Sequence, residues 1–248
     1  MKIAICGKGG SGKSTVASLL AKAYAKKGNR VLVIDCDESN YGLHQQLGMK
    51  LPKSFIDNFG GKNEVMKMLE VGPMNMPMLF DKQWTFDDIP SDYISEKDGV
   101  LLMSPGKIET ANEACACSFN ALMCQFVPVL KLRDNEAVIM DMEAGIEHFG
   151  RGTDNAVEAI LMVVDPSYES IKLSCKIEEI ATKINKPIYY VINKTPDDMI
   201  QTVKEGIKSS DKICGVINDE LSIKSAGLKG EELSVNNDTI NSIIDKLF

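Results

Sequence analysis

The fold of this chain is decided by the stretch Gly7-Lys8-Gly9-Gly10-Ser11-Gly12-Lys13-Ser14-Thr15. It follows the apolar residues 2–6 and precedes a helical pattern that begins near Val16. Glycines allow the backbone to curl so that successive N–H groups point inward and cradle phosphate oxygens. A helix that begins at about Lys13 turns the positive end of its dipole toward the same phosphates. The stretch therefore predicts a phosphate-binding loop between a strand and a helix.

The spacing of this loop matches the P-loop motif: a glycine, four residues, then Gly12, Lys13 and Ser14. Lys13 is expected to contact the β- and γ-phosphates, and the Ser14 hydroxyl to ligate Mg²⁺. The other nucleotide-binding residues of the loop are predicted to be Gly9, Gly10, Ser11, Gly12 and Thr15. The alternative is a glycine-rich turn without a ligand, and the flanking strand and helix argue against it.

Composition and charge limit the classes of function. The chain has 248 residues, enough for one large α/β domain, and its hydrophobic fraction of 44% is that of an ordinary globular protein. A net charge of −7 disfavours nucleic-acid binding through a broad basic face. No apolar run reaches transmembrane length, and the N-terminus enters directly on a strand. We expect a cytoplasmic protein with neither a membrane nor a nucleic-acid partner.

Seven short apolar runs, rich in Val and Ile, recur along the chain with turn or helix signals between them. They cover residues 3–6, 31–34, 100–103, 137–140, 160–164, 188–192 and 213–217. Runs of this kind are typical of parallel strands buried on both faces, and alternation with amphipathic helices implies βαβ units. We predict an α/β fold with a doubly wound, mainly parallel sheet and helices on both faces. Residues 1–248 form one domain, with an insertion on the sheet's rim at about residues 51–97.

Polar residues follow three of the predicted strands, where ligands of doubly wound sheets gather. Asp35 and Asp37 close the second strand, and a carboxylate at Asp37 can orient the water that attacks the γ-phosphate. Asp35 could instead cap the next segment. Asp141 ends another strand and is expected to reach Mg²⁺, through a water. Asn193 and Lys194 end a late strand, and an asparagine there can donate to and accept from a purine.

The loop with its second lysine, Lys8, resembles the deviant Walker A motif of the MinD, ParA, ArsA and nitrogenase-iron-protein group of SIMIBI-like P-loop NTPases. The resemblance implies a homodimer in which Lys8 reaches the partner's nucleotide, with Lys8, Lys13 and Asp37 as catalytic residues. A solvated loop lysine is the alternative for Lys8. It also implies that Asp141 and Gly145 belong to a second switch, and that Asn193 and Lys194 recognise the base. Because Thr195 and Pro196 follow where GTP-specific proteins continue to an aspartate, ATP is favoured over GTP.

Seven cysteines form an odd number in a chain that we expect to lack a secretory signal. Cys6, Cys36 and Cys214 lie in or after apolar runs and are predicted to fill the core. Cys115 and Cys117 are separated by one residue, and in a loop or at a helix start their thiols could converge. A twofold dimer would bring four thiolates together, which suits a soft divalent metal such as Zn²⁺ or Ni²⁺.

Residues 141–153, together with the Cys-x-Cys pair, resemble the CooC branch, the nickel-insertion ATPases of carbon monoxide dehydrogenase. That resemblance implies Ni²⁺ bound by Cys115 and Cys117 across the dimer, with carbon monoxide dehydrogenase or acetyl-CoA synthase as client. Zn²⁺ could occupy the same thiolates. Whether Cys124 or His148 joins a metal site stays open.

The sequence therefore predicts a dimeric Mg²⁺-dependent ATPase that couples ATP hydrolysis to nickel delivery. The alternative is a MinD- or ParA-like positioning ATPase acting on a membrane or DNA. A third possibility is an electron-transfer ATPase with a four-iron cluster, against which the close spacing of the cysteines argues. At the two cysteines themselves, buried thiols or a redox pair remain as further alternatives.

Overall fold

A computed structural model describes residues 1–70, 78–108, 117–145, 156–234 and 238–248. Its centre is an eight-stranded sheet with the strand order β3-β4-β2-β5-β1-β6-β7-β8. The strands are β1 (Lys2–Gly7), β2 (Arg30–Asp35), β3 (Ser95–Lys97), β4 (Val100–Met103), β5 (Glu136–Asp141), β6 (Ala159–Val164), β7 (Ile188–Asn193) and β8 (Ile213–Ile217). All neighbours run parallel except β3, which pairs antiparallel with β4 at one edge. The predicted mainly parallel sheet is confirmed.

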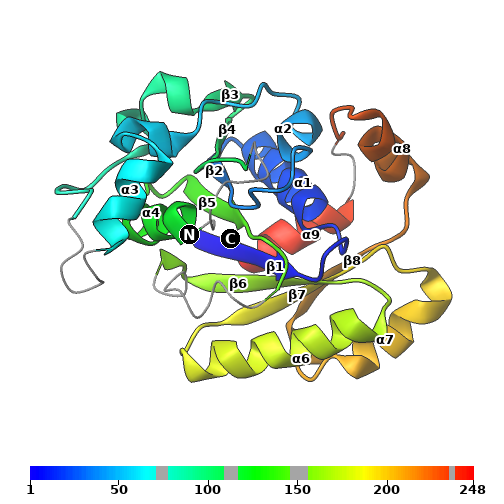
Figure 1. The fold of residues 1–248 in the computed structure, drawn as a ribbon. Helices are drawn as coiled ribbons and strands as arrows, with labels where there is room; N and C mark the ends of the chain where they lie inside the picture. Colours follow the sequence, from blue (N-terminus) through cyan, green and yellow to red (C-terminus); the bar gives the residue numbers. More distant parts are fainter. Residues whose placement is uncertain (71–77, 109–116, 146–155, 235–237) are drawn as a thin grey trace.

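Helices cover both faces of this sheet (Figure 1). They are α1 (Lys13–Lys26), α2 (Leu43–Gln46), α3 (Lys62–Glu70), α4 (Cys117–Val129), α6 (Tyr168–Lys183), α7 (Ile200–Gly206), α8 (Leu221–Lys229) and α9 (Asp238–Leu247). Alternate strand residues point to opposite faces. Ile3 and Ile5 of β1 therefore join the core under α1 and α9, whereas Ala4 and Cys6 join the core under α4 and α6. This two-sided burial makes the fold doubly wound.

The segment between residues 51 and 97 lies at the β3 edge of the sheet. Its short 3₁₀ turns are η1 (Phe55–Phe59), η2 (Phe86–Asp88) and η3 (Ser91–Tyr93). Phe55 and Phe80 are buried against Phe126 of α4, with ring centroids 4.9 and 5.2 Å apart. Aromatic pairs at such distances add stability beyond the area that they bury. The segment therefore shares the core of the main sheet.

The last helix, α9, carries an apolar stripe of Ile240, Ile243, Ile244 and Leu247. All four side chains are buried in the core that α9 shares with α1 and β8. The stripe is thus used for core packing, as expected from its sequence. Among the helices within the described ranges, none is long and apolar enough to span a membrane.

Candidate nucleotide site

The glycine-rich loop connects β1 directly to α1, as predicted. Gly10 and Gly12 have φ values of 80° and 94°, a left-handed conformation that glycine adopts at little cost. A Cβ at Gly12 would also lie 2.3 Å from the side-chain nitrogen of Asn193, so only glycine fits there. No side chain caps the N-terminus of α1. Its first N–H groups are therefore available to phosphate oxygens.

Two residues at the end of β7 brace this loop. Asn193 is buried, and its side-chain nitrogen donates to the Ser11 carbonyl oxygen over 2.8 Å. Lys194 Nζ donates to the Gly10 carbonyl oxygen over 2.9 Å. The sequence prediction for both was recognition of the base. The structure brings Asn193 to the loop backbone, where one N–H of its side-chain amide is used, and base recognition by this residue stays a prediction.

A cavity of about 420 Å³ opens beside the loop. Its lining comes from the P-loop and the start of α1, the loop after β2, the end of α2, the segment after β5 and the residue after β7: Gly9, Gly10, Gly12, Lys13, Ser14, Thr15, Asp37, Ser39, Asn40, Gln46, Glu143, Ala144 and Lys194. The structure therefore gathers most of the predicted site residues around one cavity. Gly145 directly follows Ala144 and has a φ of 110°.

Asp37 and Asn40 belong to the loop after β2. Asp37 Oδ1 accepts hydrogen bonds from the Ser39 N–H over 3.1 Å and from the Ser39 hydroxyl over 2.7 Å. Asn40 Nδ2 donates to Ser14 Oγ over 2.7 Å. This loop is consequently tied to the P-loop hydroxyl that is predicted to bind Mg²⁺.

Asp141 ends β5 and is fully buried. Neither of its carboxylate oxygens has a hydrogen bond of good geometry, although Ser14 and Lys13 lie near enough to lower its pKa. Burial, and then the negative charge of Asp35, outweigh these neighbours and raise the pKa of Asp141 to about 7. A buried carboxylate without partners beside a serine hydroxyl is a donor set that fits Mg²⁺. Ser14 and Asp141 are therefore the residues that could hold the ion.

Lys107 is a site residue that the sequence reasoning missed. It follows β4, is buried, and its Nζ lies 2.7 Å from Asp35 Oδ2. Despite this partner, burial raises the pKa of Asp35 to about 6. The one available signal was position, because Lys107 lies just beyond the carboxyl end of a parallel strand, where site residues gather.

Lys8 lies at the start of the loop, and its side chain is 35% exposed. Its Nζ is 3.7 Å from Asp165 Oδ2, in the segment after β6. An ion pair that is this long and this exposed to solvent contributes little to the stability of the fold. Lys8 is thus held loosely within its own chain, and its action on a partner's nucleotide stays a prediction.

The predicted metal ligands are only partly covered by the structure. Cys117 is the first residue of α4, and Cys115 and His148 lie outside the described residues. Cys6 and Cys214 are buried, as expected for core positions, while Cys36 and Cys124 are partly buried. Within the described ranges no group of three or more His, Cys, Asp or Glu side chains could hold a metal ion.

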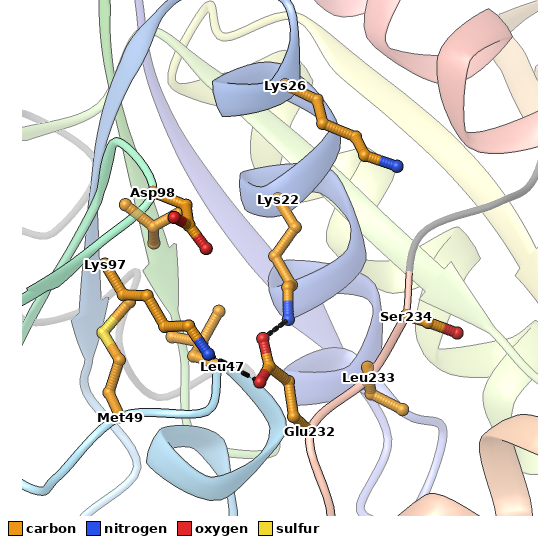
Figure 2. A pocket seen from close by; sticks show the side chains of 10 residues that line it. Lys22, Lys26, Leu47, Met49, Lys97, Asp98, Glu232, Leu233 and Ser234 are labelled. Atoms are coloured by element: carbon orange, nitrogen blue, oxygen red, sulfur yellow. Dashed lines mark hydrogen bonds and ion pairs between the residues drawn. The ribbon is translucent and has the colours of Figure 1, made fainter.

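A second cavity, of about 490 Å³, lies beside α1 and away from the glycine-rich loop. Figure 2 shows Glu232 between Lys22 and Lys97, which donate to its two carboxylate oxygens over 2.5 and 2.6 Å. Leu47, Met49 and Leu233 give the cavity an apolar wall. Glu232 thereby ties the segment before α9 to α1 and β3, a structural role distinct from the nucleotide site.

Sequence comparison with known proteins supports the assignment of a nucleotide-binding site. The model of the CobQ/CobB/MinD/ParA nucleotide binding domain matches residues 2–233. An uncharacterized ATP-binding protein of Methanocaldococcus jannaschii is 47% identical over 248 residues, 100% of this chain and 99% of that protein. The carbon monoxide dehydrogenase accessory protein CooC of Rhodospirillum rubrum is 33% identical over 206 residues, 78% of this chain and 74% of that protein.

Solved structures show the same fold. The septum site-determining protein MinD of Pyrococcus horikoshii, complexed with Mg-ADP, superposes with a TM-score of 0.67 at 17% identity. The match covers 99% of this chain and 93% of that chain. The cell division ATPase MinD of Pyrococcus furiosus gives a TM-score of 0.69 at 19% identity, covering 99% and 97%. With a family match over almost its whole length and a complete P-loop, this chain belongs to the CobQ/CobB/MinD/ParA nucleotide-binding family and is a P-loop ATPase.

Proposed function

We propose that this ATPase works as a Mg²⁺-dependent homodimer and couples its nucleotide state to delivery of nickel into carbon monoxide dehydrogenase or acetyl-CoA synthase. The identity to CooC supports the proposal at the level of the family. The Cys115-x-Cys117 pair supplies the soft ligands that such a cargo requires.

The observation that carries the proposal is the position of residues 104–108, the described start of the connection from β4 to α4. This connection leaves β4 at its carboxyl end, the edge of the sheet where the P-loop leaves β1. Gly106 packs against the ring of Phe119 in the first turn of α4, because a Cβ on Gly106 would lie 2.3 Å from that ring. Ile108 N donates to the Glu38 carbonyl oxygen, in the loop that carries Asp37, over 3.3 Å. Residues 106–108 of this connection therefore contact both the loop that carries Asp37 and the first turn of α4, the helix that begins at Cys117, while Cys115 lies outside the described residues.

Hydrolysis follows from the groups around the cavity. The loop N–H groups and Lys13 bind the phosphates, and Asp37 orients the attacking water and accepts its proton as the γ-phosphate leaves ADP. Ser14 and Asp141 would hold Mg²⁺, which would supply positive charge to neutralise the phosphates. Lys8 of one subunit contacts the nucleotide of the other, which makes turnover depend on dimer formation.

Nickel is the cargo in this scheme. Two cysteines from each subunit give four thiolates at a twofold interface. ATP can change metal affinity only if the metal-bound and metal-free states of the dimer differ in their affinity for the nucleotide. Zn²⁺ binds similar thiolate sets, so the chemistry alone limits the cargo to a soft divalent ion.

Anaerobic titration with Ni²⁺, with and without ATP, tests the proposal. We expect one tightly bound metal per dimer in the wild type and its loss in Cys115→Ala/Cys117→Ala. Cys175→Ala, which removes a partly buried thiol of α6, is the matched control and should bind metal normally. Unchanged tight binding in the double variant would refute the metal site. Activation of nickel-free carbon monoxide dehydrogenase by the loaded protein and ATP then tests the client.

A positioning ATPase is the second candidate, and its support is equally direct. The septum site-determining protein MinD of Thermotoga maritima is 28% identical over 262 aligned positions, 98% of this chain and 82% of that protein. The burial of the α9 stripe and the net charge of −7 argue against use of this tail or a basic face on a membrane or DNA. ATP-dependent co-sedimentation with anionic liposomes or with DNA would favour this candidate over nickel delivery.

A further inference from the structure

The loop after β2, residues 36–42, is called the switch loop here, and the buried lysine beside it is the feature that the ATPase assignment leaves unexplained. Lys107 is 7% exposed, and its Nζ donates to Asp35 Oδ2 over 2.7 Å. It also donates to the carbonyl oxygens of Asp37 over 2.6 Å and of Asn40 over 2.5 Å. An ammonium group has three donors, and here all three are used by residues between 35 and 40.

The hydrogen bonds of Lys107 do more than neutralise the charge of Asp35. A single carboxylate would suffice to pair a buried lysine, whereas two of the three acceptors are backbone carbonyls of the loop that carries Asp37. Hydrogen bonds from a charged donor are stronger than those between neutral groups. Lys107 therefore fixes the path of the backbone on both sides of Ser39, and with it the position of Asp37.

Neighbouring contacts join the same two segments. Tyr41 hydroxyl donates to the Ile108 carbonyl oxygen over 2.8 Å, and the Ile108 N–H donates to the Glu38 carbonyl oxygen over 3.3 Å. The Lys107 ammonium lies 5.7 Å from the centroid of the Tyr41 ring. Residues 107 and 108 are thus bound along the switch loop by side chain and backbone.

The contact between Lys107 and the switch loop connects two parts of the molecule, the P-loop and α4. Asn40, whose carbonyl oxygen accepts from Lys107, donates through its side chain to Ser14 of the P-loop. On the other side, Gly106 directly precedes Lys107 and packs against Phe119 of α4. A displacement of the switch loop on nucleotide binding would consequently displace residues 106–108 and, through Phe119, the first turn of α4.

We propose that Lys107 is a positioning residue for ATP hydrolysis, which holds Asp37 at the γ-phosphate and couples the switch loop to the entry of α4. Lys107 does not line the cavity beside the P-loop. Its effect passes through the carbonyl oxygens of Asp37 and Asn40. The competing explanation is that Lys107 only neutralises the buried carboxylate of Asp35.

Two variants separate these explanations. Lys107→Met removes the ammonium with little change in length, and Lys107→Met/Asp35→Asn also removes the carboxylate that would be left buried and unpaired. Lys208→Met is the matched control, because Lys208 is exposed and pairs with Glu179 on α6. The steady-state kcat and KM for ATP are measured for each, after thermal unfolding has shown that the variants fold.

We expect kcat to fall about 100-fold in both the single and the double variant, with KM for ATP within about threefold of the wild type, since misplacing a catalytic group by about 1 Å costs that much. Recovery of kcat in the double variant would show that Lys107 only neutralises Asp35. An unchanged kcat in Lys107→Met, or a loss confined to KM, would equally overturn the proposal.

Hydrogen exchange of the wild-type protein tests the coupling without any variant that could fail to fold. We expect a peptide covering residues 100–108 to exchange more slowly with a non-hydrolysable ATP analogue than with ADP. In Tyr41→Phe, which removes one exposed hydroxyl, this difference should shrink. Equal exchange in the two nucleotide states of the wild type would refute the coupling.

Discussion

Asp35 and Asp141 face each other across β2 and β5, where they form the last pair of the strand register. Their side chains are buried, at 1% and 0% exposure, and of the two only Asp35 has an ion pair among the described residues, with Lys107. Burying two neighbouring carboxylates is costly unless their charges are compensated. No side chain in the described part of the chain forms an ion pair with Asp141, so this carboxylate is suited to bind a cation that accompanies the nucleotide.

This relationship predicts how stability depends on pH. The pKa of Asp141 is raised from 3.8 to about 7, so between these values the folded protein holds a proton that the unfolded chain has lost. Stability of the nucleotide-free protein should therefore fall as pH rises from about 4 to about 7. Asp141→Asn should remove this part of the slope and stabilise the free protein at pH 8 by about 2–4 kcal/mol.

Urea unfolding of the nucleotide-free protein at several pH values measures the effect. Asp134→Asn, at an exposed position of the turn before β5, is the control and should unfold as the wild type does. A wild-type pH slope in Asp141→Asn would contradict the prediction. The same variant should lose the extra stability that Mg²⁺ and ADP confer on the wild type, and EDTA should reproduce that loss in the wild type.

Lys13→Ala should abolish nucleotide turnover. Lys13 is buried at the start of α1, within the cavity that is expected to hold the phosphates. Removing its charge leaves the phosphates to the backbone N–H groups alone. Phosphate release should fall below detection, and binding of a fluorescent ATP analogue should weaken. Turnover that survives the substitution would refute the assignment of the loop.

Asp37→Asn should slow ATP hydrolysis while leaving ATP binding nearly unchanged. The carboxylate lines the cavity and is oriented by two hydrogen bonds from Ser39. The amide keeps the shape but cannot accept the proton of the attacking water, and general bases contribute about 10²–10⁴-fold to rates. We expect kcat to fall by about that factor while the dissociation constant of ATP changes little. A parallel loss of ATP binding would instead indicate a structural role for Asp37.

Most of the sheet could be predicted from the sequence because buried parallel strands are continuous apolar runs. Each of the seven predicted runs lies within a strand. The missed strand is β3, whose residues Ser95, Glu96 and Lys97 are polar. It lies at the sheet's edge, pairs antiparallel with β4 and is only partly buried, so no apolar pattern marks it.

The site residues that lie at strand ends or in the P-loop could be predicted from the sequence. Asp37, Lys13 and Ser14 lie around one cavity because the carboxyl ends of parallel strands share an edge. Lys107 could not be found in this way, since its acceptors are a carboxylate and two carbonyl oxygens some 70 residues away in sequence. Carbonyl oxygens are the same at every position, so only the folded chain reveals which of them a lysine contacts.

The apolar stripe of α9 predicts a stability effect. Ile243 is buried, and a Cβ on Gly215 of β8 would lie 2.6 Å from its side chain, so helix and strand are in close contact. Ile243→Ala should destabilise the protein by about 2–5 kcal/mol in urea unfolding. Asn241→Ala, on the exposed side of the same helix, should change stability by less than about 0.5 kcal/mol. Equal small effects would mean that the stripe is free to act elsewhere.

Lys8 and Lys13 allow a decisive test of the dimeric site. If Lys8 acts on the partner's nucleotide, Lys8→Ala and Lys13→Ala should each be inactive alone. A mixed dimer would then contain one intact site, formed by Lys13 of the first variant and Lys8 of the second.

Equal amounts of the two variants should therefore recover about a quarter of wild-type turnover, because half of the dimers are mixed and each has one working site. Action of Lys8 within its own chain would give no recovery, since neither kind of subunit then carries both lysines. The weak contact of Lys8 with Asp165, 3.7 Å long, is expected to break when the second subunit arrives. Asp165→Asn should accordingly leave the recovered turnover unchanged, whereas a solvated, unused Lys8 would leave Lys8→Ala fully active without any mixing.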